Sequence, residues 1–166
     1  MENNKWKFLL QYAKTIYENE ERREHNIIEQ ATRMQSAFSF VIAALFVLIP
    51  TIIEFSAIPI CIIVSAFSSI TFCLILSLVC ATLAQSRKKR HDFPTVSQMI
   101  KEVTDNPTYY ESEEQQQKYL TETYSKIHDN YEKNNTRRAL FLKISMWSFY
   151  ASIAFCVIWF IVFICL

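Results

Sequence analysis

The chain has 166 residues, of which 51% are hydrophobic and 20% are charged, and its formal net charge is +1. It contains no glycine, although the average usage of about 7% would give roughly a dozen in a chain of this length. Glycine-rich phosphate loops and dinucleotide turns need backbone conformations and close approaches that side chains obstruct, so the composition excludes most nucleotide-dependent enzymes.

The first predicted element is one long helix, from Lys5 to Ile53. Apolar residues recur at helical spacing from Trp6 to Phe38, and neither proline nor glycine interrupts the chain between Lys5 and Ile49. We therefore expect residues 1–36 to form a cytoplasmic amphipathic helix that leads directly into a membrane.

Ionisable residues interrupt the apolar stripe of this helix in a segment that we call the charged belt: Glu20, Arg22, Arg23, Glu24 and His25. One interpretation is an exposed segment, because several of its charges stand at the spacing of helical neighbours and can form ion pairs. The other is a ligand or subunit contact built from Arg22, Arg23 and His25, since buried charge at a subunit seam sets register or senses an anionic partner. We expect the residues of the charged belt to regulate the protein or to form contacts between its subunits.

Three apolar runs contain no Asp, Glu, Lys or Arg: Phe38–Ile53, Ile58–Ala84 and Ile144–Leu166. At about 1.5 Å per residue, each is long enough to cross or nearly cross a hydrocarbon core roughly 30 Å thick. The predicted fold class is an all-α membrane protein with three transmembrane helices and long amphipathic cytoplasmic extensions. After the amphipathic helix, the expected parts are a transmembrane hairpin over 37–85, a cytoplasmic helical region over 86–137 and a third transmembrane helix over 138–166.

The positive charges near these runs predict the orientation of the chain. They lie on one side of the predicted membrane: Arg33, Arg87, Lys88, Lys89, Arg90, Arg137 and Arg138. The connection between the first two runs, which Pro50 and Pro59 bracket, is short and lacks them. Because cytoplasmic flanks carry an excess of Lys and Arg, we expect the N-terminus in the cytoplasm and the C-terminus outside.

The basic run from Arg87 to Arg90 has a second interpretation, as a site for nucleic acid or anionic lipid. No aromatic or polar readout residues interleave with it, so we assign the run to orientation and expect no sequence-specific nucleic-acid partner.

Small, mildly polar residues recur at nearly helical spacing within the second and third runs. We call them the small-residue faces: Ser65, Ser69, Cys73 and Ser77 in the second run, and Ser145, Ser148 and Ser152 in the third. Such faces permit close helix packing, in which hydroxyl groups bond across the interface. They also suit the lining of a water-filled pore that several chains build together.

Two further helices are predicted between the second and third runs. Thr95 or Ser97 starts a short helix that carries Met99, Ile100 and Val103 on one side as a packing element. A second long helix is expected from Tyr109 to Leu166, able to pair with the first helix or with neighbouring chains. Because the cytoplasmic core is thin, we expect the chain to form homo-oligomers in the bilayer.

The three histidines, His25, His91 and His128, lack metal-binding spacing to one another or to cysteine. We therefore expect no metal, no cofactor and no enzymatic activity. A helical RNase that uses His128 or His25 is the least favoured alternative.

The segment Tyr12–Arg33, YAKTIYENEERREHNIIEQATR, leads at once into the first apolar run. In this arrangement, about the first 85 residues resemble the SLATT proteins, small helical membrane effectors of prokaryotic defence loci. The chain also looks like the membrane accessory proteins of type VI CRISPR loci. Its third run departs from a two-crossing effector.

The resemblance implies a protein of the bacterial inner membrane that permeabilises or depolarises it after infection is sensed. It further implies assembly into a multimeric pore through the cytoplasmic helices, with a defence-system sensor protein or a nucleotide signal as the trigger. The alternative function is a noncatalytic membrane anchor or adaptor that recruits a soluble partner through the tyrosine-rich segment Tyr109–Tyr131.

Overall fold

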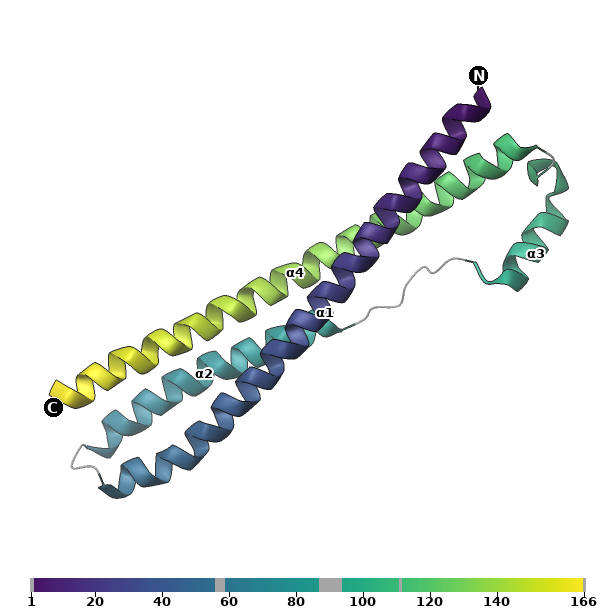
Figure 1. Cartoon of the computed structure of the whole chain (residues 1–166). Coiled ribbons are helices and arrows are strands. Elements are labelled where there is room, and N and C mark those ends of the chain that lie inside the picture. Colours follow the sequence, from purple (N-terminus) through teal and green to yellow (C-terminus); the bar gives the residue numbers. More distant parts are fainter. Residues whose placement is uncertain (1, 56–58, 87–93, 111, 166) are drawn as a thin grey trace. The chain divides into compact units, whose positions relative to one another are not determined.

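The structure is a computed structural model that describes residues 2–55, 59–86, 94–110 and 112–165. Its elements are the helices α1 (Glu2–Phe55), α2 (Ile60–Gln85), α3 (Val96–Asp105) and α4 (Glu113–Cys165), with a short 3₁₀ helix, η1 (Pro107–Tyr110), before α4 (Figure 1). No strand occurs among these residues. The predicted all-α class is therefore confirmed.

The chain divides into two compact units, and the long helices α1 and α4 contribute to both. Unit 1 comprises Met1–Asn26 and Arg87–Thr136, and unit 2 comprises Ile27–Ser86 and Arg137–Leu166. The division within α1 falls after Asn26, and the division within α4 falls after Thr136. Helix α3 belongs to unit 1 and helix α2 to unit 2.

Helix α1 continues through Pro50 and ends at Phe55. The predicted helix Lys5–Ile53 already included Pro50, whereas the interpretation of Pro50 as one bracket of the connection to the second run was wrong. Proline removes one backbone donor and crowds the preceding turn, but the chain can remain helical on either side of it. Pro59 does stand where expected, as the residue that precedes α2.

Two helices are long and apolar enough to cross a membrane, α2 and the part of α4 up to Val162, where the sequence predicted three. The first run is not among them within the described part of the chain. Its side chains at Leu48 and at 51–53 lie outside the described residues, and the preceding turns of α1 carry Arg33 and Gln35.

Unit 2 packs α2 against both α1 and α4, and Figure 1 shows α2 running alongside them. Ile27, Ala31, Ala84 and Leu142 form a buried cluster, and both alanines are fully buried. Small residues at such contacts let helix backbones approach closely. Farther along, the rings of Phe38 and Phe149 lie 4.8 Å apart.

Unit 1 pairs the first turns of α1 with the first half of α4. The Tyr17 ring meets Tyr124 and Tyr131 edge-on, at centroid distances of 5.7 and 5.5 Å. Lys118 lies over the Trp6 ring, 5.8 Å from its centroid. Of the two arrangements predicted for the long helices, unit 1 shows the one in which they bury their stripes against each other.

Helix α3 begins as predicted but packs differently. Thr95 and Gln98 form a reciprocal capping box, in which each side chain bonds the other residue's backbone N–H. The expected packing side is not buried, because Ile100 is 61% exposed and Val103 is 37% exposed.

Candidate functional site

The charged belt is divided between the interior and the surface of unit 1. Glu24 is buried and Glu20 is half-buried, whereas Arg22, Arg23 and His25 are exposed. The two carboxylates thus occupy the seam of α1 that the spacing of apolar residues predicts. The basic members are exposed and accessible to a partner, although Arg23 also reaches the Glu20 carboxylate.

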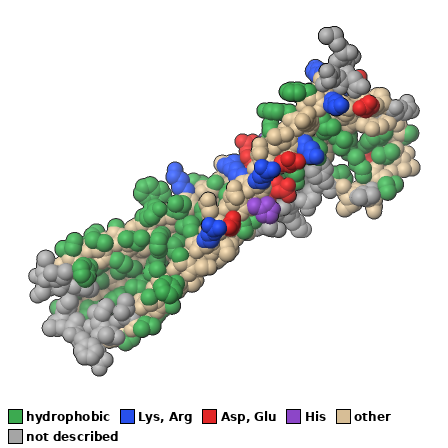
Figure 2. All heavy atoms as spheres, viewed as in Figure 1, with side chains coloured by type: hydrophobic (Ala, Val, Ile, Leu, Met, Phe, Trp, Pro, Cys, Tyr) green, Lys and Arg blue, Asp and Glu red, His purple; other side chains and the backbone are tan. Residues whose placement is uncertain are grey.

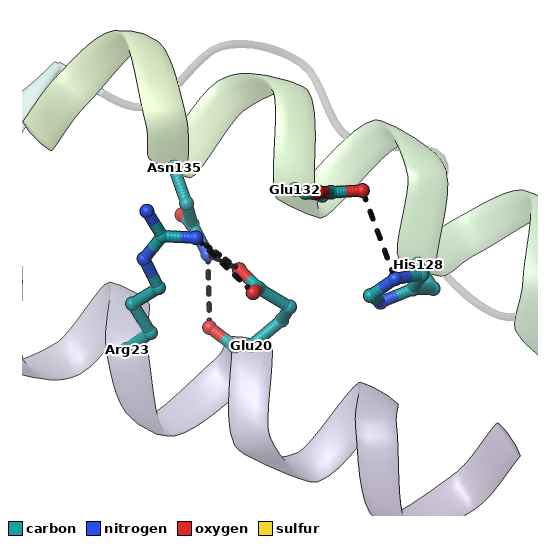
Figure 3. A network of polar contacts seen from close by, with 5 residues as sticks. All are labelled: Glu20, Arg23, His128, Glu132 and Asn135. Carbon is teal, nitrogen blue, oxygen red and sulfur yellow. Dashed lines mark hydrogen bonds and ion pairs between the residues drawn. The ribbon is translucent and has the colours of Figure 1, made fainter.

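Glu20 is the centre of a polar contact between α1 and α4, which Figure 3 shows with Arg23 beside it. The side-chain amide of Asn135 donates to the backbone oxygen of Glu20 and to its Oε2, both at 2.9 Å. Arg23 Nη1 donates to the same carboxylate at 3.2 Å. Asn135 is only 1% exposed, so these bonds supply the partners that a buried amide requires.

Sequence reasoning missed Asn135. The available signal was its position, because Asn135 follows Ile127 and Tyr131 at intervals of four residues and therefore lies on the same face of α4. A polar residue on an apolar face indicates a partner on the facing helix.

The histidines do not form a common site among the described residues. His25 is exposed on α1, His128 is half-buried on α4, and His91 lies outside the described residues. His128 Nε2 lies 3.9 Å from a carboxylate oxygen of Glu132, one turn later (Figure 3). This pair lies within one helix and brings one carboxylate to the imidazole.

Unit 2 contains a reciprocal contact between the small-residue faces. Ser77 Oγ donates to the Ser145 carbonyl at 2.7 Å, and Ser145 Oγ donates to the Ser77 carbonyl at 2.8 Å. Both residues are fully buried. The two hydroxyls therefore join α2 to α4, and each has a hydrogen-bond acceptor on the other helix.

The remaining members of the small-residue faces have different surroundings. Ser69 Oγ accepts a hydrogen bond from Trp159 Nε1 at 3.1 Å. Ser152 is buried and bonds its own helix at Phe149. Cys73 and Ser148 are half-buried, and Ser65 is exposed. Part of each face is thus used within the chain, and part remains accessible.

A polar layer joins α1 to α2 near the C-terminal end of α2. Gln85 Nε2 donates to the side-chain oxygens of Gln35 at 2.9 Å and Thr32 at 3.2 Å. Gln35 Nε2 in turn donates to Thr82 Oγ1 at 3.0 Å. These four side chains form a continuous network, and none of them had been predicted as a site residue.

Arg138 completes this polar layer from α4. Its Nε donates to the backbone oxygen of Ala84 at 2.7 Å and its Nη2 to that of Gln85 at 3.5 Å. The last carbonyls of a helix lack partners within it and carry partial negative charge, so a guanidinium there both caps and complements α2. Arg138 is 7% exposed, which makes it part of the packing and not only an orienting charge.

The other predicted orienting residues lie at the surface or outside the described residues. Arg137 is exposed over the Phe141 ring, 5.6 Å from its centroid, and Arg33 is exposed in an ion pair with Glu29. The run Arg87, Lys88, Lys89 and Arg90 falls outside the described residues.

Within the described part of the chain, no group of three or more His, Cys, Asp or Glu residues is arranged to hold a metal ion. Comparison with protein-family models, with curated proteins and with solved structures found no match for this chain.

Proposed function

We propose that this chain is a membrane effector that oligomerises and permeabilises or depolarises the bacterial inner membrane. The observation that carries the proposal is the distribution of polar and apolar side chains in unit 2. Ser77 and Ser145 are fully buried, whereas Phe40, Phe72 and Phe160 are 76%, 68% and 64% exposed. Figure 2 shows hydrophobic side chains covering much of the visible face of this unit.

Such a distribution suits hydrocarbon as the surrounding solvent. Only 28% of the most apolar window of α2 and 11% of that of α4 are buried within the chain, which favours lipid as the surroundings of these helices. In lipid, an unsatisfied polar group costs several kcal/mol, which explains why the Ser77 and Ser145 hydroxyls bond each other's backbone.

The proposed topology has three crossings. The run Phe38–Ile53 would form a hairpin with α2, and α4 would provide the third crossing. Arg33, Arg137 and the run Arg87–Arg90 would then flank the cytoplasmic surface, with the N-terminus inside and the C-terminus outside.

Permeabilisation requires more than one copy of the chain. Ser77 and Ser145 close the contact between α2 and α4 in unit 2 and are fully buried, so this contact leaves no space for ions among the described residues. The exposed Ser65 and the half-buried Cys73 and Ser148 offer small-residue surface for contact with another copy. Exposed basic members of the charged belt are available to a sensor protein or a nucleotide signal as the trigger.

The adaptor alternative has less support, because its proposed recruiting segment is largely used inside unit 1. Tyr131 is buried against Tyr17, Tyr124 meets the same ring, and Tyr119 bonds Glu102. The RNase alternative has less support still, because His25 is exposed on α1 and His128 pairs with a carboxylate of its own helix.

The decisive experiment measures assembly and leakage together. The full chain, with an inducible dimerisation tag on its N-terminus to replace the trigger, would be reconstituted in liposomes that contain a potassium gradient. We expect a detergent-extracted mass of several chains and potassium release when dimerisation is induced. A monomer by mass, or oligomers that never release potassium, would refute the proposal, and the second result would favour the adaptor.

A further inference from the structure

A small cavity lies in unit 1 where α3, η1 and α4 meet. It has a volume of about 170 Å³ and is lined by Glu102, Asn106, Tyr110 and Tyr119. One water requires roughly 15 Å³ by a comparable measure, so the cavity has room for a small organic group. We propose that this cavity binds an organic ammonium ion.

The charge of the lining favours a cation. Glu102 supplies a carboxylate, and Tyr119 donates its hydroxyl hydrogen to Oε2 of that carboxylate at 2.7 Å. The Asn106 amide nitrogen donates to the backbone oxygen of Glu102 at 3.3 Å. Within the described residues, this leaves Glu102 Oε1 and the Asn106 amide oxygen to accept hydrogen bonds from a ligand.

The two tyrosine rings add a second attraction for an ammonium group. Their centroids lie 5.6 Å apart in an edge-to-face arrangement, and tyrosine faces attract cations through the ring quadrupole. The Tyr110 hydroxyl is buried at the wall of the cavity. It therefore adds a polar group beside the two aromatic rings.

The position of Tyr110 is fixed by its backbone. Gln116 Nε2 donates to the Tyr110 carbonyl oxygen at 2.7 Å, which holds the end of η1 against the start of α4. The aromatic wall of the cavity is therefore built by a specific contact and does not depend on the ligand.

The orientation of α3 also fits a polar site. This helix turns Glu102 toward α4 while Ile100, 61% exposed, stays at the surface. An amphipathic helix ordinarily buries its apolar side, so polar contacts position α3 here. The Glu102 carboxylate therefore lies at the cavity, while the apolar side chain of Ile100 remains exposed.

The same lining disfavours anions. A carboxylate beside two phenol groups repels a phosphate, so the nucleotide signal considered above as a trigger would not bind here. A primary ammonium group on a short alkyl chain matches both the acceptors and the aromatic rings. Its source is either a free amine or a lysine side chain of a protein, and the two share this chemistry.

Calorimetric titration of the full chain in detergent micelles tests the site, with butylammonium as the free amine and butanoate as the anionic counterpart. We expect millimolar binding of butylammonium, none of butanoate, and a roughly tenfold or greater weakening in Glu102→Gln, because a charge-assisted hydrogen bond is lost. Glutamine still accepts a bond from Tyr119, so the local fold is kept. Glu122→Gln, which removes an exposed carboxylate of α4, is the matched control and should bind normally.

A second arm uses Nα-acetyl-lysine methylamide. Binding tighter than that of butylammonium assigns the site to a protein lysine, and weaker binding assigns it to a free amine. Tyr110→Phe gives a variant that leaves the carboxylate in place and should weaken either ligand. Equal binding to the original chain and Glu102→Gln, or no binding of either ammonium compound, would overturn the proposal. This outcome is independent of potassium release, so the cavity and the proposed effector function can fail separately.

Discussion

Ser77 on α2 and Ser145 on α4 donate their hydroxyl hydrogens to each other's backbone carbonyls, at 2.7 and 2.8 Å. Their two Oγ atoms also lie 3.1 Å apart. The contact satisfies both hydroxyls where no water reaches them, since both residues are fully buried. It fixes the rotation and the depth of one helix against the other.

We predict that Ser77→Ala and Ser145→Ala each lower the free energy of unfolding in detergent by about 1 kcal/mol, the usual net value of such a bond. The double variant should lose slightly less than the sum, because either single change removes the contact between the two Oγ atoms, while the remaining hydroxyl keeps its bond to the partner's backbone carbonyl. Ser68→Ala removes an exposed serine of α2 and should have little effect. Strict additivity would show that the hydroxyls act independently.

A larger effect is expected at Arg138. Arg138→Gln removes the guanidinium that bonds the carbonyls of Ala84 and Gln85 at the end of α2. We predict a loss of about 2 kcal/mol or more, since a hydrogen bond from a charged group is worth about 1.5–3 kcal/mol and the carbonyls stay buried. Thermal unfolding in detergent measures this loss. Arg137→Gln, at an exposed neighbour, should retain nearly the original stability, and equal losses in the two variants would contradict the capping role.

The sequence predicted the helices well because their signals are local. Apolar spacing, the absence of glycine and the residues of the Thr95 capping box all act within a few turns, and α1, α2 and α3 follow them. The exception is Pro50. Whether a proline ends a helix depends on whether the residues after it remain helical, and local helix propensity does not predict this at Pro50.

The polar contacts were harder to predict because each needs a partner far along the chain. In the sequence, Arg138 served only to predict the orientation of the chain in the membrane. Its bond to the backbone oxygen of Ala84 depends on how α4 is aligned along α2. Asn135 and Glu20 meet in the same way, across a separation that no sequence spacing encodes. The serine faces were visible, but the choice of Ser77 and Ser145 as the contacting pair required the packed helices.

The phenol of Tyr119 gives a prediction that depends on pH. Burial, followed by the hydrogen bond to Glu102, raises the pKa of Tyr119 above the ordinary value of 10. A raised pKa in the folded state means that the contact contributes fully below pH 10 and is lost as the pH rises through the higher pKa. Tyrosinate absorbance in an alkaline titration should therefore show a delayed component.

Tyr119→Phe should remove that delayed component, whereas Tyr12→Phe, at an exposed position, should leave it in place. Glu102→Gln should bring it to lower pH, because the carboxylate no longer opposes formation of the phenolate. A titration curve that is unchanged in Tyr119→Phe would show that the delayed component has another origin.

The proposed topology predicts that the two chain ends are accessible from opposite sides. A protease-sensitive tag fused before Met1 should be cleaved from the cytoplasmic side of inverted vesicles, and the same tag after Leu166 should be protected until detergent is added. The physical reason is that Arg33, Arg137 and the run Arg87–Arg90 resist translocation. Cleavage of both tags in intact inverted vesicles would place an even number of crossings between them and would remove the three-crossing topology.

The charged belt gives the prediction most specific to the proposed function. Arg22 and Arg23 are exposed on α1, and reversing both to Glu should repel an anionic partner or a matching copy of the chain. We predict that this variant inserts normally but forms fewer oligomers and releases less potassium when dimerisation is induced. Because Arg23 also bonds Glu20, Arg22→Glu alone separates the surface effect from the loss of that ion pair. The control is Lys126→Glu, which reverses an exposed charge on α4 in the same unit. It should leave assembly and potassium release unchanged. An equal loss in this control would indicate a general effect of charge and no specific role for the charged belt.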